Sequence, residues 1–318
     1  MSRGDGMLRY AALAAALAAT QLLQSNYVTS VLIVIALHAM PAIGLSLLMG
    51  YAGQISLGHA AFYGLGAYGS ALIALHAGLH PWFAMLVTVA AVGFIAWCLG
   101  WLVFRLHGHY LAMATLALGI VVHVGFVELR DWTGGPNGLR DIPLLSLFGI
   151  GLSADALFFV VAWGFCLLLV FLADNLVRSP LGLALRTIGE NERVAASLGA
   201  SPNAHKRLVL AVSAIYAAIA GGLYAHYLGY LSPSPFDVGF SIKLLVMVAI
   251  GGFARVWGVL FGVAFVTVLG EILKPLGDYD IIAFGLLLIF TMIFCPDGLL
   301  QKSSELTARL WRQRPRPA

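Results

Sequence analysis

Long apolar segments, separated by short polar or glycine-rich stretches, recur along the whole chain. Most are close to the length of about 20 residues that an α-helix needs to cross the hydrocarbon core of a bilayer. The pattern predicts helices at residues 8–24, 27–49, 50–77, 81–104, 110–127, 154–172, 208–228, 242–253, 256–273 and 281–294. We therefore expect an all-α, polytopic membrane protein of about ten transmembrane helices.

Three of these segments are unusual. Segment 50–77 is interrupted by glycines, and segment 242–253 is too short to cross a bilayer without distortion. The first segment, 8–24, has two interpretations. Residues 11–19 resemble the apolar part of a signal peptide, but we favour an uncleaved first helix because many later segments also need a membrane.

The composition agrees with a membrane protein. Hydrophobic residues make up 61% of the 318 residues, charged residues only 10%, and the mean hydropathy is +0.93. Soluble domains have about 25% charged residues, so this chain has too few charges to cover a water-facing surface. A soluble enzyme, a disordered protein and a nucleic-acid-binding domain are therefore excluded. The three cysteines, Cys98, Cys166 and Cys295, lie in apolar segments and indicate small buried side chains, not disulfides or a metal site.

The basic residues predict the orientation. The net charge of +4 is typical of inner-membrane proteins, which collect lysine and arginine on their cytoplasmic side. With the N-terminus inside, fourteen of the 18 basic residues are cytoplasmic, and the outer segments carry only Arg130, Arg140, Lys243 and Lys274. We therefore expect both termini, including a basic tail at 298–318, to lie in the cytoplasm.

A faint internal repeat divides the single membrane domain, residues 1–318, into two halves at about 8–129 and 154–297. In each half a glycine-rich stretch precedes a helix that itself contains glycine, Gly64 in the first half and Gly262 in the second. With five helices each, the halves have opposite orientations in the membrane. Two inverted five-helix halves favour a pathway between them, although glycine is common enough in membrane helices for the similarity to arise by chance.

The stretch from Gly50 to His59 combines glycines with polar side chains at a membrane boundary. Lipid cannot satisfy free backbone N–H and C=O groups, so irregular backbone at this depth needs protein or water around it. Gln54, Ser56 and His59 are therefore expected to face a cavity or the bundle interior, along the translocation path. The alternative is tight helix packing at the glycines, and the two interpretations are compatible.

Other ionisable residues give weaker signals. Three further histidines, His38, His123 and His226, fall in or near predicted helices, where each either lines a pathway or bonds to a neighbouring helix. Carboxylates are confined to positions near helix ends. Their absence from the middle of the predicted helices argues against a proton-driven transporter that works alone. A membrane enzyme is the third class, and its only candidate cluster is Arg105, His107 and His109.

The loop at 174–207 is the most specific feature of the chain. Ser179 suits a helix N-cap and Pro180 a first helical position. Gly189 is expected to end or bend that helix, a second helix is expected over residues 190–198, and Gly199 suits a C-terminal cap.

The second helix of this loop is predicted to be amphipathic. Its first turn contains Glu190 and Glu192, with Arg193 next, and its apolar face consists of the three residues Val194, Ala195 and Leu198. A short amphipathic helix on the cytoplasmic side is typical of docking to a soluble partner. The alternative is a helix that lies on the lipid head groups.

Four motifs resemble those of ABC-importer permeases for branched-chain amino acids. They are GQISLGHAAF at 53–62, TGGPNGL at 133–139 followed by IP at 142–143, the loop at 179–199, and PDGL at 296–299. The resemblance covers most of the chain and is closest to the second of the two permease subunits in such importers. The Glu-Ala-Ala coupling motif of other importers is not literal here, because Arg193 and Val194 separate Glu192 from the alanines.

The resemblance implies a bacterial inner-membrane subunit that forms the path for Leu, Ile or Val. Its partners would be a second permease, two cytoplasmic ATPases that dock on the coupling loop, and a periplasmic binding protein. The chain has no GxxxxGK[ST] phosphate loop, so the ATPase must be a partner. No catalytic residue, metal or cofactor is expected. The alternatives are a permease for urea or another small amide or amino acid, and a stand-alone secondary transporter.

Overall fold

The computed structural model describes residues 26–106, 108–147, 150–151, 155–274 and 280–294, together with Tyr10 and Leu13. The predicted first helix at 8–24, except for these two residues, lies outside the described residues. So do His107, the PDGL motif at 296–299 and the basic tail at 298–318.

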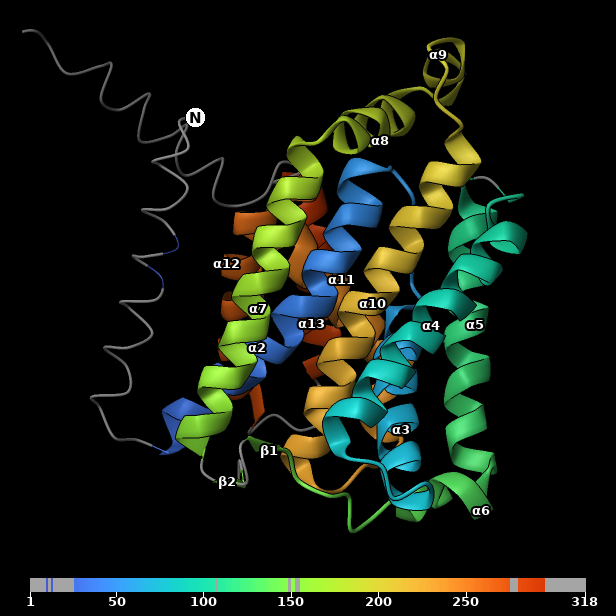
Figure 1. The fold of residues 1–318 in the computed structure, drawn as a ribbon. Helices are drawn as coiled ribbons and strands as arrows, with labels where there is room; N and C mark the ends of the chain where they lie inside the picture. Colours follow the sequence, from blue (N-terminus) through green and yellow to red (C-terminus); the bar gives the residue numbers. More distant parts are fainter. Residues whose placement is uncertain are drawn as a thin grey trace, which may run out of the picture.

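The described chain is helical apart from short loops and one small pair of strands (Figure 1). The helices of the first half are α2 (Asn26–Ser46), α3 (His59–His76), α4 (Pro81–Val103), α5 (His109–Glu128) and α6 (Arg130–Thr133). Those of the second half are α7 (Asp155–Arg178), α8 (Pro180–Glu190), α9 (Glu192–Ser197), α10 (Pro202–Leu228), α11 (Val238–Gly251), α12 (Val256–Leu273) and α13 (Asp280–Phe294). Short helical turns at Leu47–Tyr51 (π), Gly135–Asn137 and Ser234–Phe236 (both 3-10) complete the elements, with antiparallel strands β1 (Ser146–Leu147) and β2 (Ile150–Gly151).

Six described helical segments are long and apolar enough to cross a membrane: Asn26–Tyr51, Pro81–Val103, His109–Glu128, Asp155–Arg178, Pro202–Leu228 and Val256–Leu273. Two shorter apolar helices, Val238–Gly251 and Ile282–Thr291, accompany them. A multi-pass, helical membrane protein is therefore confirmed. α7 and α10 extend beyond the predicted apolar segments, because their ends toward α8 and α9 continue as helix through polar residues.

Helices α2 and α10 lie at the centre of the bundle. α10 packs against α2, α3 and α4, whereas α2 packs against α7, α11 and α12. Small residues permit the close contact of α3 with α10. A Cβ atom on Gly221 would lie only 2.0 Å from the carbonyl oxygen of Tyr63, and one on Gly66 would lie 2.4 Å from Ala218 Cα. Packing of this kind is how membrane helices associate without a hydrophobic driving force.

The two ends of the bundle differ. Helices α8 and α9 project from one end, while α6 and the β1–β2 pair cover the opposite end (Figure 1). At the covered end, Leu139 and Leu231 form an isolated antiparallel bridge between the two halves of the chain. α2 ends at the α8–α9 end, where Ser46 Oγ donates to Phe253 O at 2.7 Å and Tyr51 OH donates to Ala254 O at 2.7 Å. These bonds hold the end of α2 to the α11–α12 turn.

Candidate functional site

The chain leaves the helical conformation between α2 and α3. After the π-helical turn Leu47–Tyr51, Gly53 adopts a φ of +66°, a region that glycine enters without strain. A Cβ atom there would lie 3.1 Å from Gly189 Cα in α8. Residues 53–58 are not helical, as the glycine-rich pattern predicted.

Protein groups satisfy the backbone of this irregular segment. The Leu57 N–H donates to Thr115 Oγ1 of α5 at 3.0 Å, and the Ala60 N–H at the start of α3 donates to Ser241 Oγ of α11 at 3.0 Å. The Gln54 N–H donates to Leu48 O at 3.1 Å. The segment thus packs against the bundle, with Gln54, Ser56 and Gly58 buried and with Gly53 and Ile55 exposed.

Ser56 and His59 come together in a buried polar cluster. The His59 side chain is fully buried at the start of α3, and its Nδ1 lies 3.2 Å from Ser56 Oγ. Its Nε2 lies 2.5 Å from Ser213 Oγ of α10. Both ring nitrogens therefore have a hydroxyl partner, and the cluster joins the 53–58 segment to the central helix α10. Ser213 was not predicted, because nothing in the sequence distinguishes it from the other small residues of α10.

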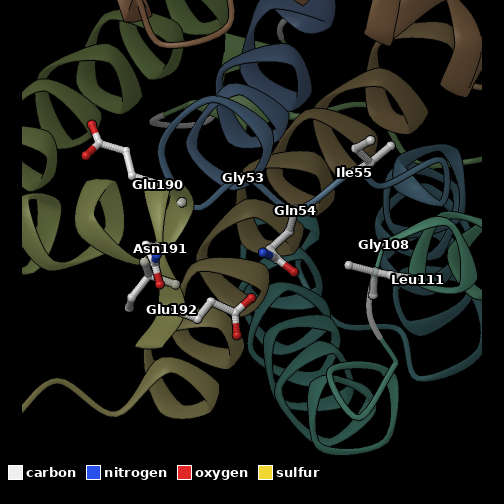
Figure 2. A pocket seen from close by; sticks show the side chains of 10 residues that line it. Gly53, Gln54, Ile55, Gly108, Leu111, Glu190, Asn191 and Glu192 are labelled. Atoms are coloured by element: carbon white, nitrogen blue, oxygen red, sulfur yellow. The ribbon is translucent and has the colours of Figure 1, made fainter. Parts of the chain in front are cut away.

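Gln54 lies apart from this cluster and lines a cavity of about 240 Å³ beside the loop that joins α8 to α9 (Figure 2). Its Nε2 donates to Ala52 O at 2.9 Å. The opposite walls come from Glu192 at the start of α9 and from Gly108 and Leu111 at the start of α5. In Figure 2 the side chains of Gln54 and Glu192 point toward one another across the cavity.

The glycines of the motif also serve tight packing. A Cβ atom on Gly58 would lie 2.6 Å from the carbonyl oxygen of Thr115, so α5 can approach the segment only because this side chain is absent. The two interpretations of the GQISLGH stretch, polar site and close packing, therefore apply to different residues of the same segment.

The first helix of the predicted coupling loop is confirmed. Ser179 is the N-cap of α8 and its hydroxyl accepts from Gly182 N, while Pro180 is the first helical residue. Gly199 follows α9 with a φ of +87°. The boundary between the helices was predicted wrongly. Asn191, not Gly189, separates them, because its Oδ1 accepts from Arg193 N at 3.0 Å and Val194 N at 3.3 Å. Glu190 thus ends α8.

The predicted apolar face of the second helix needs a correction. Ala195 is 1% exposed and packs inward, whereas Val194 and Leu198 are 47% and 76% exposed. With 3.6 residues per turn, Val194 and Leu198 lie on one face of the helix, whereas Ala195 points about 100° away from Val194 and toward the bundle. Glu190, at the end of α8, and Arg193, in α9, are exposed.

Glu192 has an internal partner that the sequence did not reveal. Its Oε1 forms an ion pair with Nζ of Lys206, near the start of α10. The Lys206 side chain is 2% exposed, against 37% for that of Glu192. In the sequence, Lys206 belongs to a basic stretch that reads as ordinary interfacial charge, and only the folded chain shows that it is buried.

No group of three histidine, cysteine, aspartate or glutamate side chains in the described parts of the chain is arranged to hold a metal ion. Among the other histidines, His226 Nδ1 lies 2.7 Å from Pro143 O and ties α10 to the loop before β1. Cys98 is exposed on α4 and Cys166 is buried in α7, and both are free thiols.

Comparisons with known proteins give a consistent result. A family model described as "Branched-chain amino acid transport system / permease component" matches residues 27–295. The high-affinity branched-chain amino acid transport system permease protein LivM of Escherichia coli K12 is 32% identical over 83% of this chain and 68% of its own length. LivH of Salmonella typhimurium LT2 is 25% identical over 83% of this chain and 91% of its own length.

A more distant relative bears a different name. The autoinducer 2 import system permease protein LsrC of Escherichia coli O9:H4 (strain HS) is 26% identical over 56% of this chain and 53% of its own length. No solved structure matches the chain significantly.

Proposed function

This chain belongs to the family of permease components of branched-chain amino acid transport systems, and from that membership we propose how it works as the membrane-spanning subunit of an ATP-driven importer. It carries branched-chain amino acids and is not itself an enzyme. The observation that carries this conclusion is the family match over residues 27–295. This range covers the described helices from α2 to α13 and omits only Asn26, the first residue of α2.

The partners follow from this role. A second permease would complete the path, two cytoplasmic ATPases would supply the energy, and a periplasmic binding protein would deliver the substrate. The similarity to both LivM and LivH, which carry the name of the same transport system, supports a paired permease. Because the similarity to LivM is higher, we assign this chain the LivM position in the pair.

The end that bears α8 and α9 is proposed to face the cytoplasm. Seven of the described basic residues support this orientation, since they belong to that end: Arg105, Arg178, Arg186, Arg193, Lys206, Arg207 and Arg255. The opposite half holds the described residues Arg130, Arg140, Lys243 and Lys274. Both termini would then be cytoplasmic, in a protein of about ten spans. A periplasm-only reporter fused to the C-terminus would contradict this topology if it became active.

The two halves are proposed to be inverted repeats in which α2, α3 and α4 correspond to α10, α11 and α12. The packing supports this correspondence because the central helix of each half packs against helices of the other half. α10 contacts α3 and α4 of the other half, and α2 contacts α11 and α12. A pseudo-twofold axis that exchanges α2 with α10 would produce this arrangement.

We assign Gln54, Ser56 and His59 to the translocation path. Their support is the buried polar cluster at the break between α2 and α3, and the cavity that leads from Gln54 to the α8–α9 loop. Gln54→Ala and His59→Ala are expected to lower uptake or alter substrate preference in the assembled importer. Unchanged uptake and preference in both would make these residues packing elements only.

The α8–α9 loop is proposed as the docking element for an ATPase. Its exposed side chains include Glu190, Arg193, Val194 and Leu198, whereas Glu192 pairs with the buried Lys206 and Ala195 packs against the bundle. The experiment is co-purification of the ATPases with the chain carrying Leu198→Asp, which alters an exposed residue and leaves the buried contacts intact. Loss of the ATPases is expected, and normal recovery with normal substrate-stimulated ATP hydrolysis would favour a helix that rests on lipid.

The substrate class has one alternative with support. LsrC shows that a relative of this chain carries the name of an importer for autoinducer 2, which is not a branched-chain amino acid. ATP-driven uptake by the reconstituted importer, measured for leucine, isoleucine, valine and autoinducer 2, separates the candidates. Uptake of autoinducer 2 in preference to all three amino acids would overturn the assignment.

A further inference from the structure

A second cavity, of about 430 Å³, lies toward the end of the bundle opposite α8 and α9. It is lined by residues of α2, α3, α10, α11, α12 and α13, so both halves of the chain contribute to it. Its volume falls in the range of about 300–1,000 Å³ that is usual for small-molecule sites. It is separate from the cavity at Gln54, with which it shares no lining residue.

Two polar atoms at this cavity have no hydrogen-bond partner among the described residues. They are the hydroxyl of Tyr63, whose side chain is 1% exposed, and Nδ1 of His38. Most buried polar groups in proteins are satisfied, so each exception needs an explanation. A polar ligand in the cavity supplies one.

The cavity also contains charges of both signs. The Lys243 ammonium lies 5.2 Å from the centroid of the Phe284 ring. The Glu271 carboxylate accepts from Tyr27 OH at 3.0 Å and pairs with Lys274 at 2.6 Å. Both Lys243 and Glu271 line the cavity, and Asp237, the N-cap of α11, lines it too. The contacts of Glu271 and Asp237 hold these carboxylates in place before a ligand arrives.

Apolar side chains form the remaining wall. Val34 of α2, Ile242 of α11 and Phe284 of α13 line the cavity, and Phe240 packs against Tyr63 with ring centroids 5.0 Å apart. An aliphatic side chain of a ligand would be removed from water against this wall.

We propose that this cavity binds an α-amino acid as its zwitterion, with the carboxylate toward Lys243, the ammonium toward Asp237 and Glu271, and an aliphatic side chain against the apolar wall. The inference rests on the proposed function and names the substrate-binding site of that permease. Charges of both signs favour a neutral zwitterion over a simple anion or cation, because each charged end meets an opposite charge in a poorly hydrated site.

The cavity lies close to the polar cluster at the start of α3. Tyr63 follows His59 by one helical turn on α3, so the two residues lie on the same face of the helix. The Ser56–His59–Ser213 cluster therefore lies one turn of α3 away from a residue that lines this cavity.

The test measures binding of radiolabelled leucine to the complete permease–ATPase complex in nanodiscs, without the binding protein. Leucinamide lacks the carboxylate and 4-methylpentanoate lacks the ammonium, and each is expected to compete at least about tenfold more weakly than leucine. Equal competition by either analogue would overturn the proposal.

Two variants locate the site. Lys243→Met is expected to weaken leucine binding at least about tenfold, whereas Arg140→Met, which removes an exposed positive charge at the same end, leaves it unchanged. Tyr63→Phe keeps the ring and is expected to weaken binding about threefold to tenfold. Its matched control is Tyr216→Phe, because the Tyr216 hydroxyl donates to Leu169 O at 2.9 Å, outside the cavity.

The outcomes separate this inference from the proposed function. Normal leucine binding by monodisperse Lys243→Met complex overturns the site, even when the unaltered complex takes up leucine. If that variant fails to assemble, Tyr63→Phe and the two analogues decide instead. Failure of the unaltered complex to take up any branched-chain amino acid in the presence of its binding protein overturns the proposed function itself.

Discussion

Glu192 and Lys206 tie α9 to α10, and Glu192→Ala tests what this ion pair contributes. The substitution leaves the Lys206 ammonium without its carboxylate, and that side chain is only 2% exposed. Removal of one partner from a fully buried ion pair costs about 3–5 kcal/mol. Because 37% of the Glu192 side chain is exposed, solvent screens the pair, and we expect about 1–3 kcal/mol here.

The opposite substitution, Lys206→Met, is expected to cost much less. It leaves a carboxylate that already reaches solvent, and methionine fills the apolar space beside the Phe104 ring, whose centroid lies 6.0 Å from Nζ. The expected cost is about 1 kcal/mol or less. The double variant removes both charges, so it is expected to recover most of the loss caused by Glu192→Ala.

Hydrogen exchange of the backbone amides of α9 in the assembled complex measures these costs directly. A loss of about 1–3 kcal/mol corresponds to exchange that is about 5- to 150-fold faster in Glu192→Ala. Glu190→Ala is the matched control, because it removes an exposed carboxylate two residues away. Faster exchange in Lys206→Met than in Glu192→Ala would refute the reasoning, since burial of the ammonium is what makes the two differ.

Three further predictions concern packing, the polar cluster and capping. Gly221→Ala places a methyl group against the backbone of α3 and should destabilise the protein by more than about 2 kcal/mol, whereas Gly164→Ala meets no atom within 4 Å and should be neutral in thermal unfolding. Ser213→Ala removes a partner of the buried imidazole, worth about 1 kcal/mol, so uptake should fall about fivefold with assembly unchanged; unchanged uptake contradicts this. Asn191→Ala should cost about 1 kcal/mol, and Ser201→Ala, a cap without a side-chain bond, should cost less.

Local signals in the sequence were reliable where they depend on neighbouring residues. Ser179 and Pro180 begin α8 and Gly199 follows α9, because capping and turn preferences act over a few residues. The irregular stretch before α3 was also predicted, since lipid excludes unpaired backbone. The number of spans could not be predicted in the same way, because short apolar helices such as α11 fall below the length that a helix needs to cross a bilayer alone.

Features that depend on distant contacts could not be predicted. Asn191, and not the glycine two residues before it, separates α8 from α9. Its side-chain oxygen accepts from two backbone N–H groups at the start of α9, which a glycine cannot do. The burial of Ala195 and Lys206 is decided by how α9 rests on the bundle, and both residues look like surface residues in the sequence. Ser213 gains its role only because α3 crosses α10 there.

The contact between Gly53 and Gly189 has a mechanical consequence. Side chains absorb small movements by changing rotamer, but this contact joins two stretches of backbone, and a Cβ atom on Gly189 would lie 2.8 Å from Tyr51 O. A displacement of α8 is therefore expected to move the α2–α3 break with it, and a side chain at either glycine would force these two stretches of backbone apart.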